Sequence, residues 1–273
     1  MKSSRPRGRP KAFHDKSESA TIQSLDRAMT VLKVVAEGSG MSLSEIAAVG
    51  DDSPATVYRI LTTLKKHAIV EFDETSQLWH VGAGAFRIGS SFLRRTRLIE
   101  QSRRVMERIM GESGETANLA IIDRGEVIFI SQVETHEPIR AFFRPGTRGP
   151  VHASGIGKAI MAYRSAEHIH ATLSGHKLER FTSHTLADEA ALVTELDETR
   201  ARGWSVDDEE RTNGMRCIAA PIFNQFGEAI AGISISGPTV RMTKEKDAGF
   251  GHLVRAAADE ITKAIGGVMP GDG

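Results

Sequence analysis

The segment over residues 42–66 reads SLSEIAAVGDDSPATVYRILTTLKK, and it predicts two short helices joined by a tight turn. Ser42 and Glu45 have the spacing of a capping box, in which the side chain of each residue bonds the backbone N–H of the other. A helix over residues 43–49 follows, and Gly50 makes the turn after it. This short capped helix is typical of the first half of a helix-turn-helix.

The second helix of the segment has one apolar face and one polar face. Ser53 suits the N-cap, and Pro54 suits the first helical position, where a missing N–H costs nothing. We expect this helix to continue to about His67 and to bury the residues at helical spacing, Val57, Ile60, Leu61 and Leu64. Its other face carries hydroxyl and basic groups, from Thr56, Tyr58, Arg59, Thr62, Thr63, Lys65 and Lys66. Such a face suits the major groove of duplex DNA.

A further helix and a hairpin flank this pair. Helical spacing predicts a helix over about residues 24–37, ended by Gly38, with a buried face made of Leu25, Ala28, Met29, Leu32 and Val35. Residues 69–72 and 78–81 alternate around a polar turn, which predicts a hairpin. Three helices and a hairpin indicate a winged helix-turn-helix over residues 21–83. The alternative is a small helical protein-interaction domain.

Residues 1–20 are rich in Pro, Gly, Ser and Arg, and we expect a disordered basic tail because little could be buried there. The stretch Pro6-Arg7-Gly8-Arg9-Pro10 resembles the core of an AT-hook. In such a core, Arg7 and Arg9 would enter the narrow minor groove of A·T-rich DNA. The alternative is a solvated tail that matches by chance.

The charge of the 273-residue chain is unevenly distributed. The formal net charge is zero, but residues 1–104 carry 17 Lys/Arg against 11 Asp/Glu, and residues 105–273 carry 18 against 24. The first part therefore suits a polyanion, and the second part repels one. A single cysteine excludes an internal disulfide and a multi-cysteine zinc site. We find no membrane span and no secretory signal, so a soluble cytoplasmic protein is expected.

The rest of the chain predicts a helical linker over residues 84–113 and an α+β domain over residues 114–268. The expected strands cover residues 117–122, 127–133, 139–143, 204–207, 217–223 and 229–236. The expected helices cover residues 157–163, 166–174, 188–202 and 243–265. Hairpin signals between neighbouring strands favour an antiparallel sheet with helices packed on it.

A candidate ligand site begins at His152-Ala153-Ser154-Gly155-Ile156-Gly157-Lys158, which leads directly into a helix. Glycines at a helix start leave backbone N–H groups open to a small anion. The stretch is not a P-loop, because the first glycine is absent and Ala159 replaces the Ser/Thr after the lysine. It also lacks the third glycine of a dinucleotide loop. A carboxylate therefore fits better than a phosphate.

Three further segments supply polar groups for a small pocket. Asp207 opens an acidic run after an apolar strand, and Cys217 begins another strand. Ser234 and Ser236 alternate, so both hydroxyls point to the same face of one strand. The ordinary alternatives are a buried packing cysteine, a solvated acidic run and small residues that permit close packing.

Two other functions stay open at this point. Cys217, His152 and Asp207 could act as nucleophile, base and orienting carboxylate of an enzyme, although nothing in the sequence places them within hydrogen-bond reach. A constitutive DNA-architectural protein would instead use Arg7 and Arg9 with no ligand effect.

The residues also carry a resemblance that covers essentially the whole chain after the tail. The chain resembles the IclR family of bacterial transcriptional regulators, and the segments that carry the likeness are residues 25–28, 43–47, 53–64, 114–120, 151–159, 201–204, 207–210, 214–221 and 234–238. The resemblance implies a winged helix-turn-helix, a GAF-like C-terminal effector domain, and dimers that commonly pair into tetramers. It implies no catalytic residue, cofactor or metal.

Within the family, the chain looks most like the glyoxylate-responsive allantoin-regulon repressors. That likeness places the effector contacts on Ser154, Gly155, Ile156, Asp207, Cys217, Ser234, Ile235 and Ser236. It implies glyoxylate as the effector, and pyruvate, glycolate or another short acid as alternatives. For double-stranded operator DNA, the expected contacts to or near base edges are Thr56, Tyr58, Arg59 and Thr62, and those to phosphates are Ser53, Thr63, Lys66 and His80.

Overall fold

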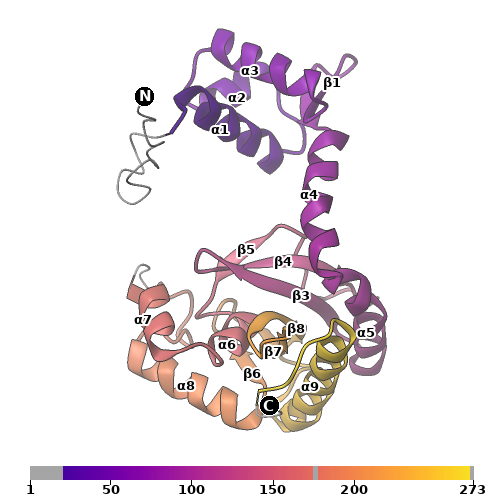
Figure 1. Ribbon diagram of the computed structural model, residues 1–273, viewed down its shortest axis with the longest axis vertical. Helices are drawn as coiled ribbons and strands as arrows, with labels where there is room; N and C mark the ends of the chain where they lie inside the picture. The colour runs from indigo at the N-terminus through magenta and orange to yellow at the C-terminus, as the bar shows by residue number, and fades with distance from the viewer. Residues whose placement is uncertain (1–20, 175–177, 271–273) are drawn as a thin grey trace, which may run out of the picture. The chain divides into compact units, whose positions relative to one another are not determined.

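The computed structural model describes residues 21–174 and 178–270, without the side chains of residues 91–96, 173 and 174. The chain divides into two compact units, residues 1–92 and residues 93–273 (Figure 1). The basic tail expected over residues 1–20, with Arg7 and Arg9, lies outside the described residues.

The first unit is a winged helix-turn-helix, as predicted. Its elements are α1 (Gln23–Glu37), α2 (Leu43–Val49), α3 (Pro54–Lys66), β1 (Val70–Asp73) and β2 (Leu78–Val81). The capping box is present, because the Ser42 N–H donates to Glu45 Oε2 at 2.8 Å and the Glu45 N–H donates to Ser42 Oγ at 3.3 Å. The two strands pair antiparallel and form the wing. A bridge from Met41 to Trp79 ties the wing to the start of α2.

The buried face of α1 differs from the prediction. Val31, Val34 and Val35 form its buried part, whereas Leu25 and Met29 are 58% and 47% exposed. All the buried residues lie in the C-terminal half of the helix, where it packs against α2, α3 and β2. The prediction was therefore right for Val35, which is buried, and for Leu32, which packs against the core, and wrong for Leu25 and Met29.

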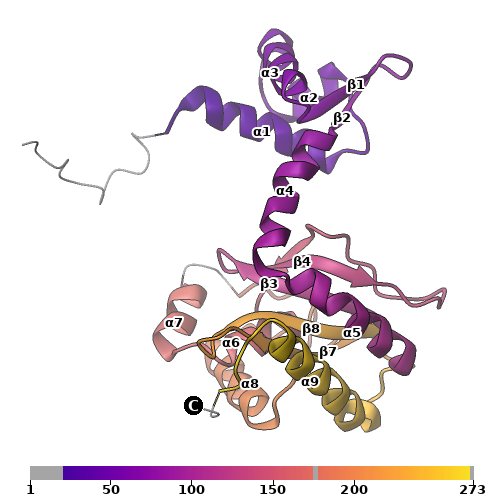
Figure 2. The ribbon, with the colours of Figure 1, turned by 45° about the vertical axis from the view of Figure 1, so that its right-hand side comes forward.

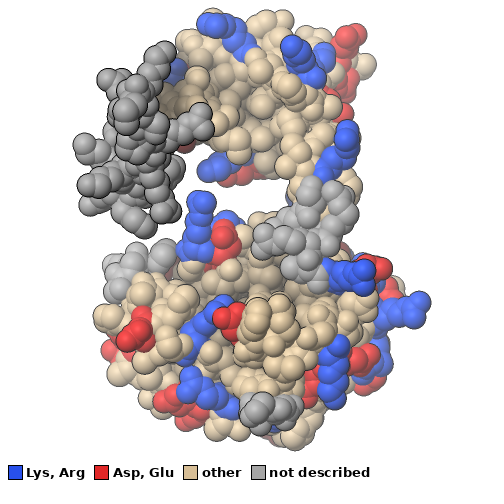
Figure 3. Space-filling model, viewed as in Figure 1, with Lys and Arg blue, Asp and Glu red and all other residues tan. Residues whose placement is uncertain are grey.

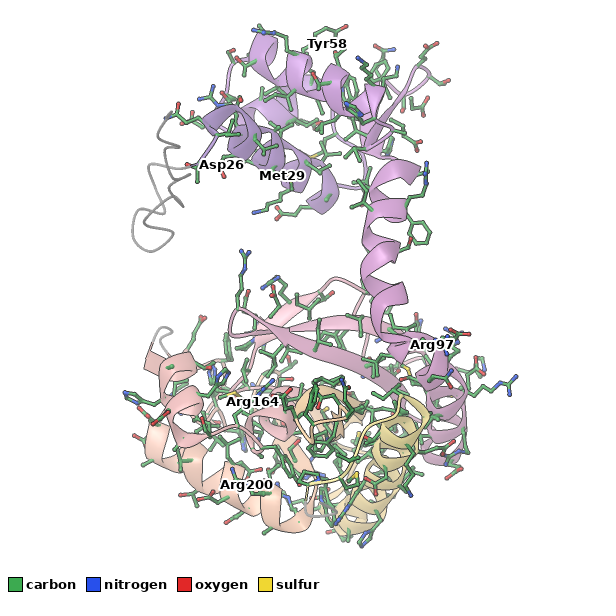
Figure 4. The ribbon with its side chains drawn as sticks, in the orientation of Figure 1. Asp26, Met29, Tyr58, Arg97, Arg164 and Arg200 are labelled. Carbon is green, nitrogen blue, oxygen red and sulfur yellow. The ribbon has the colours of Figure 1, made fainter. Side chains whose placement is uncertain are left out.

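The segment predicted as a helical linker over residues 84–113 consists of two helices. These are α4 (Ala83–Thr96) and α5 (Leu98–Ser113), and the break between them falls at Arg97, which has a φ of 48° (Figure 4). A left-handed conformation cannot continue an α-helix, so the chain changes direction there. No glycine or proline lies at this position, so no residue there predicts a break.

The second unit contains a six-stranded antiparallel sheet in the order β5-β4-β3-β8-β7-β6. The strands are β3 (Thr116–Asp123), β4 (Glu126–Val133), β5 (Arg148–Pro150), β6 (Ser205–Asp208), β7 (Met215–Phe223) and β8 (Ala229–Pro238). The α+β antiparallel architecture predicted from the sequence is thus confirmed.

Helices cover both faces of this sheet. On one face lie α5 and α9 (Asp247–Ala264), which follows the short 3-10 helix η1 (Lys244–Lys246); α5 and α9 run side by side (Figure 2). On the other lie α6 (Gly155–Met161), α7 (Ala166–Ser174) and α8 (Glu189–Arg202). Each face buries its own apolar core. Along β7, Ile218, Ala220 and Ile222 enter the core under α5 and α9, and the alternate residues Ala219 and Phe223 enter the other core.

The strand predicted over residues 139–143 is absent, and β5 takes the edge position instead. Ala141 and Phe143 do turn inward, and this alternation produced the strand signal. Pro138 and Pro145 bracket the segment, and neither can donate a ladder hydrogen bond. The segment therefore packs on the core without joining the sheet.

We expect Gly157→Ala to destabilise the fold by about 1–3 kcal/mol, the usual cost of forcing extra volume into a packed site. A Cβ at Gly157 would lie 2.2 Å from the carbonyl oxygen of Val151, and backbone cannot swing aside as a side-chain tip can. The control is Gly111→Ala in α5, where a Cβ meets open space and helix propensity predicts a gain of about 0.5–1 kcal/mol. Urea unfolding should show opposite signs for the changes in the free energy of unfolding of the two variants. Equal changes would contradict the close approach of Gly157 to the backbone of Val151.

Candidate functional site

The polar face of α3 is exposed. Tyr58 is 55% exposed, and Figure 4 shows it on the side of α3 that faces away from α1. Of the residues predicted to contact DNA from this helix, Thr56 is half-buried and the others are exposed, namely Ser53, Tyr58, Arg59, Thr62, Thr63 and Lys66. Figure 3 shows Lys and Arg side chains along this edge of the first unit. The face is therefore polar, basic and accessible.

The hydroxyls of this face are bonded within the helix. Thr62 Oγ1 donates to the Tyr58 carbonyl at 2.7 Å, and Thr63 Oγ1 donates to the Arg59 carbonyl at 2.8 Å. Ser53 Oγ accepts from the Thr56 N–H at 3.2 Å and caps the helix. Ser53 Oγ also donates to Thr56 Oγ1 at 2.9 Å. Among the described residues, the side-chain donors of Thr56, Tyr58 and Arg59 are therefore directed to no acceptor of the protein.

His80 lies on the wing rather than on α3. It is half-buried, and its ring packs against Gly40, where a Cβ would come within 2.5 Å of Cε1. Gly40 has a φ of 113°, so two constraints favour glycine there. The ring is fixed between the wing and the turn before α2.

The second unit contains a cavity of about 170 Å³ between α6 and the strands β6, β7 and β8. Its wall includes most of the side chains that the sequence nominated for an effector: Ser154, Gly155, Ile156, Asp207, Cys217, Ser234 and Ser236. These residues come from four segments that are far apart in the sequence. The structure thus brings them together at one place.

Ile235 is the nominated residue that the structure does not bring to the cavity. It pairs with Ile218 of β7, and its side chain is fully buried in the core under α5 and α9. Because side chains alternate along a strand, Ser234 and Ser236 face α6 and the residue between them faces away. The two serines share one face, as their spacing predicted.

A buried asparagine orients these two hydroxyls. Asn118 Nδ2 donates to Ser236 Oγ at 3.1 Å and to Ser234 Oγ at 3.5 Å, and Asn118 Oδ1 accepts from Gln132 at 2.8 Å. Both serine oxygens act as acceptors toward Asn118, which leaves their protons for another partner. The sequence analysis did not assign Asn118 to the site, although a polar residue in an apolar strand was a usable signal.

The first turn of α6 forms a second wall. Ser154 caps it by accepting from the Gly157 N–H at 3.3 Å. The N–H groups of Gly155 and Ile156 have no carbonyl partner within the helix, because they belong to its first turn. A Cβ on Gly155 would lie 2.8 Å from Cys217 Sγ, so only glycine lets this turn approach β7 so closely.

Asp207 supplies the one carboxylate of the cavity wall among the described residues. Its Oδ1 accepts from the Glu210 N–H at 2.9 Å, which fixes the turn that follows β6. Burial raises the pKa of Asp207 to about 6, and the nearby Lys158 ammonium opposes that rise. The group is ionised at neutral pH but gains a proton in mildly acidic solution.

The three residues of the enzyme alternative do not form a catalytic triad. Burial raises the pKa of the Cys217 thiol to about 11, so the group is a neutral thiol and a poor nucleophile. His152 Nε2 is 2.9 Å from the Glu179 carbonyl, and the ring stacks on Phe181. His152 lines a neighbouring, larger cavity of about 670 Å³ and not the one that holds Cys217 and Asp207.

Other wall residues were not found by sequence reasoning. Phe129 and Phe143 stack with ring centroids 4.4 Å apart and form an apolar wall with Ala141. Arg148 and Arg211 line both cavities; Arg148 pairs with Glu126 at 2.6 Å, and Arg211 lies over the Phe181 ring. Apart from Phe129 of β4, these residues come from loops and from the edge strand β5, whose positions depend on the tertiary fold.

Two family models match the chain. The model of the IclR helix-turn-helix domain matches residues 24–74, and that of the bacterial transcriptional regulator IclR C-terminal region matches residues 90–263. The chain belongs to the IclR family. Its family is one of ligand-responsive transcriptional regulators with a DNA-binding helix-turn-helix, and not one of enzymes.

Individual relatives align with this IclR-family chain over nearly its whole length. It is 50% identical to the HTH-type transcriptional regulator BhcR of Paracoccus denitrificans, over 96% of this chain and 93% of that protein. It is 36% identical to the HTH-type transcriptional repressor AllR of Klebsiella pneumoniae, over 96% of each protein. The expected likeness to the AllR repressors is confirmed, and the identity to BhcR is higher.

The fold agrees with a solved member of the family. The crystal structure of Thermotoga maritima IclR matches with a TM-score of 0.75 at 28% sequence identity, over 89% of this chain and 99% of that one. Among the helices of residues 21–174 and 178–270, none has the length and apolar character that crossing a membrane requires.

The raised pKa of Asp207 predicts a pH-dependent stability in the absence of ligand. The pKa is about 6 in the folded chain against an ordinary 3.8, so folding takes up a proton between these values and the ionised group destabilises the fold above pH 6. At about 1.4 kcal/mol per pKa unit, the penalty is about 3 kcal/mol. Asp207→Asn should therefore be more stable than wild type at pH 8 and no more stable near pH 4.

Chemical unfolding at pH 8, 6 and 4 measures this difference. The control is Asp197→Asn, because the Asp197 side chain is 70% exposed on α8 and its ionisation should matter little. A stability gain for Asp207→Asn that is the same at all three pH values would contradict the prediction.

Proposed function

We propose that this regulator binds operator DNA through α3 and that a short 2-oxo acid, with glyoxylate favoured, occupies the cavity beside α6 and changes operator affinity. The observation that carries the proposal is the convergence of Ser154, Asp207 and the two serines of β8 on one cavity. A homodimer or a pair of dimers would present two recognition helices to a palindromic operator, and such a protein works in the cytoplasm.

The DNA half of the proposal rests on the exposed face of α3. Arg59 and Tyr58 carry outward donors, and we assign them with Thr56 and Thr62 to base edges or their neighbourhood. Ser53, Thr63 and Lys66 lie on the same exposed side and suit phosphates, as does His80 from the wing. Arg7 and Arg9 of the tail would reach the minor groove.

The effector half rests on complementary hydrogen bonding. The carboxylate of a 2-oxo acid would accept from the serine hydroxyls of β8 and from the first-turn N–H groups of α6. Hydrated glyoxylate is a gem-diol, whose hydroxyls would donate to Asp207. Charge-assisted bonds of this kind contribute about 1.5–3 kcal/mol each, so three or four support micromolar binding of a small ligand.

The apolar wall bears on the choice among short acids. A two-carbon acid would fill only the polar end of the 170 Å³ cavity and would leave the rings of Phe129 and Phe143 without a ligand contact. Pyruvate would place its methyl toward that wall, whereas glycolate would offer one hydroxyl to Asp207. Calorimetry with these three acids measures which chemistry the cavity prefers.

Arg59→Ala should weaken specific operator binding by about 5- to 150-fold while leaving effector affinity unchanged. Loss of a base-reading arginine costs about 1–3 kcal/mol and relaxes sequence preference at its position. Arg103→Ala is the matched control, since it removes the same charge from the exposed surface of α5. Gel-shift titration at fixed salt measures both. An equal loss in the two variants would mean that net charge and not α3 decides binding.

Ser236→Ala should weaken glyoxylate binding by about 10- to 100-fold, because one charge-assisted bond is lost and Asn118 loses an acceptor. Thr194→Ala, which removes a surface hydroxyl from α8, is the control and should bind normally. Calorimetry and operator titration with and without the acid test both steps, since operator and effector must change each other's affinity by the same factor. An operator affinity that no acid changes would favour the architectural alternative.

A further inference from the structure

The most deeply buried charge of the second unit has no assigned role in the site described above. Lys158 lies in α6, one turn after the cavity wall, and its side chain is only 1% exposed. An ammonium group is costly to bury unless its protons are used and its charge is balanced. The partners of Lys158 therefore show what the structure gains from placing it there.

Those partners lie on both sides of Asp207. Lys158 Nζ donates to the Val206 carbonyl and to Glu210 Oε1, each at 2.5 Å. Val206 immediately precedes Asp207, and the Glu210 N–H bonds the Asp207 carboxylate. One ammonium thus ties both ends of the turn that presents Asp207 to the helix that forms the opposite wall of the cavity.

The surrounding acids complete the balance of charge. Glu195 of α8 lies 3.7 Å from Lys158 Nζ and is itself held by Arg202 at 2.6 Å. Glu210 is bonded to Lys158 through one oxygen, while its Oε2 is buried with no partner among the described atoms. Burial raises the pKa of Glu210 to about 7, and the Lys158 ammonium opposes that rise, so the lysine stabilises the ionised form of this buried carboxyl group.

We propose that Lys158 is a positioning residue for the effector: its ammonium joins the Asp207 turn to α6 and keeps the two walls of the cavity in register. This inference rests on the proposed function, because it assumes that the effector binds between those walls. Lys158 then has two effects: its hydrogen bonds link the two walls of the cavity, and its positive charge favours ionised Asp207. Without it, the turn is released and Asp207 takes up a proton more readily.

The pH dependence of effector affinity separates these effects from simple support of the fold. If the effector donates to ionised Asp207, effector affinity falls as Asp207 gains a proton. Removing Lys158 then moves the midpoint pH of this fall in affinity to a higher value. The groups that face this cluster are Lys158 of α6, Asp207, Asp208 and Glu210 of β6 and its turn, Glu195 and Arg202 of α8, and, farther off, His152 and Arg211.

The experiment compares Glu210→Gln with the double variant Lys158→Met/Glu210→Gln. Lys158→Met alone leaves a buried carboxylate without its cation, which opposes folding, whereas the double variant removes a cation and an anion together. The comparison isolates the lysine, because a glutamine oxygen can still accept from its ammonium. Lys246→Met, a lysine replacement in η1 outside the cavity, is the control.

Operator binding checks that each variant is folded, and calorimetry with glyoxylate from pH 5 to 8 gives the affinity and its midpoint. We expect the double variant to keep operator binding, to bind glyoxylate at least tenfold more weakly than Glu210→Gln at pH 7.5, and to show a higher midpoint. Equal affinities and midpoints in the two variants would overturn the proposal. So would a loss of glyoxylate affinity with an unchanged midpoint, or one accompanied by loss of operator binding.

Hydrogen exchange without ligand separates this inference from the proposed function. If wild type binds none of the acids, the proposed function fails. The link that Lys158 makes to the Asp207 turn is then tested by hydrogen exchange of the backbone amides of residues 206–211. Faster exchange there in the double variant than in Glu210→Gln, with operator binding retained, supports the link. Equal exchange in both variants overturns it.

Discussion

Helix α6 lies against the sheet at a distance that only glycine allows, and the candidate site depends on this approach. A Cβ on Gly155 would meet the sulfur of Cys217 in β7, and one on Gly232 in β8 would meet Ile156. The two glycines lie on opposite sides of the interface, so the helix cannot move outward without losing packing at both points. The close approach brings the first-turn N–H groups to the same cavity as the serines of β8.

The cavity holds polar groups at a cost to stability. Asp207 and Cys217 both have pKa values raised by burial, which means that their charged forms are disfavoured there. Asn118 and Lys158 compensate in different ways, the first by fixing hydroxyl orientation and the second by supplying charge. A polar ligand that brings its own donors and acceptors would complete this arrangement.

The sequence predicted what is encoded locally. The capping box, the Ser-Pro start of α3 and the hairpin each lie within a few residues, and each was found. The shared face of Ser234 and Ser236 followed from the period of a strand, and the same alternation takes Ile235 out of the cavity. What could not be predicted depends on distant packing: which half of α1 is covered, the break at Arg97, the unpaired segment over residues 139–143, and the wall made by Phe129 and Arg211.

The internal hydrogen bond of Thr62 has a consequence for the bases that α3 can distinguish. Because its hydroxyl proton is directed to the Tyr58 carbonyl, the outward part of the side chain consists of a methyl group and oxygen lone pairs. In a major groove, such a surface packs on the C5-methyl of thymine or accepts from the exocyclic amines of adenine and cytosine, and it offers no proton to guanine O6 or N7. Selection of guanine by this helix would then fall to Arg59, whose guanidinium carries the donors that Thr62 has already used.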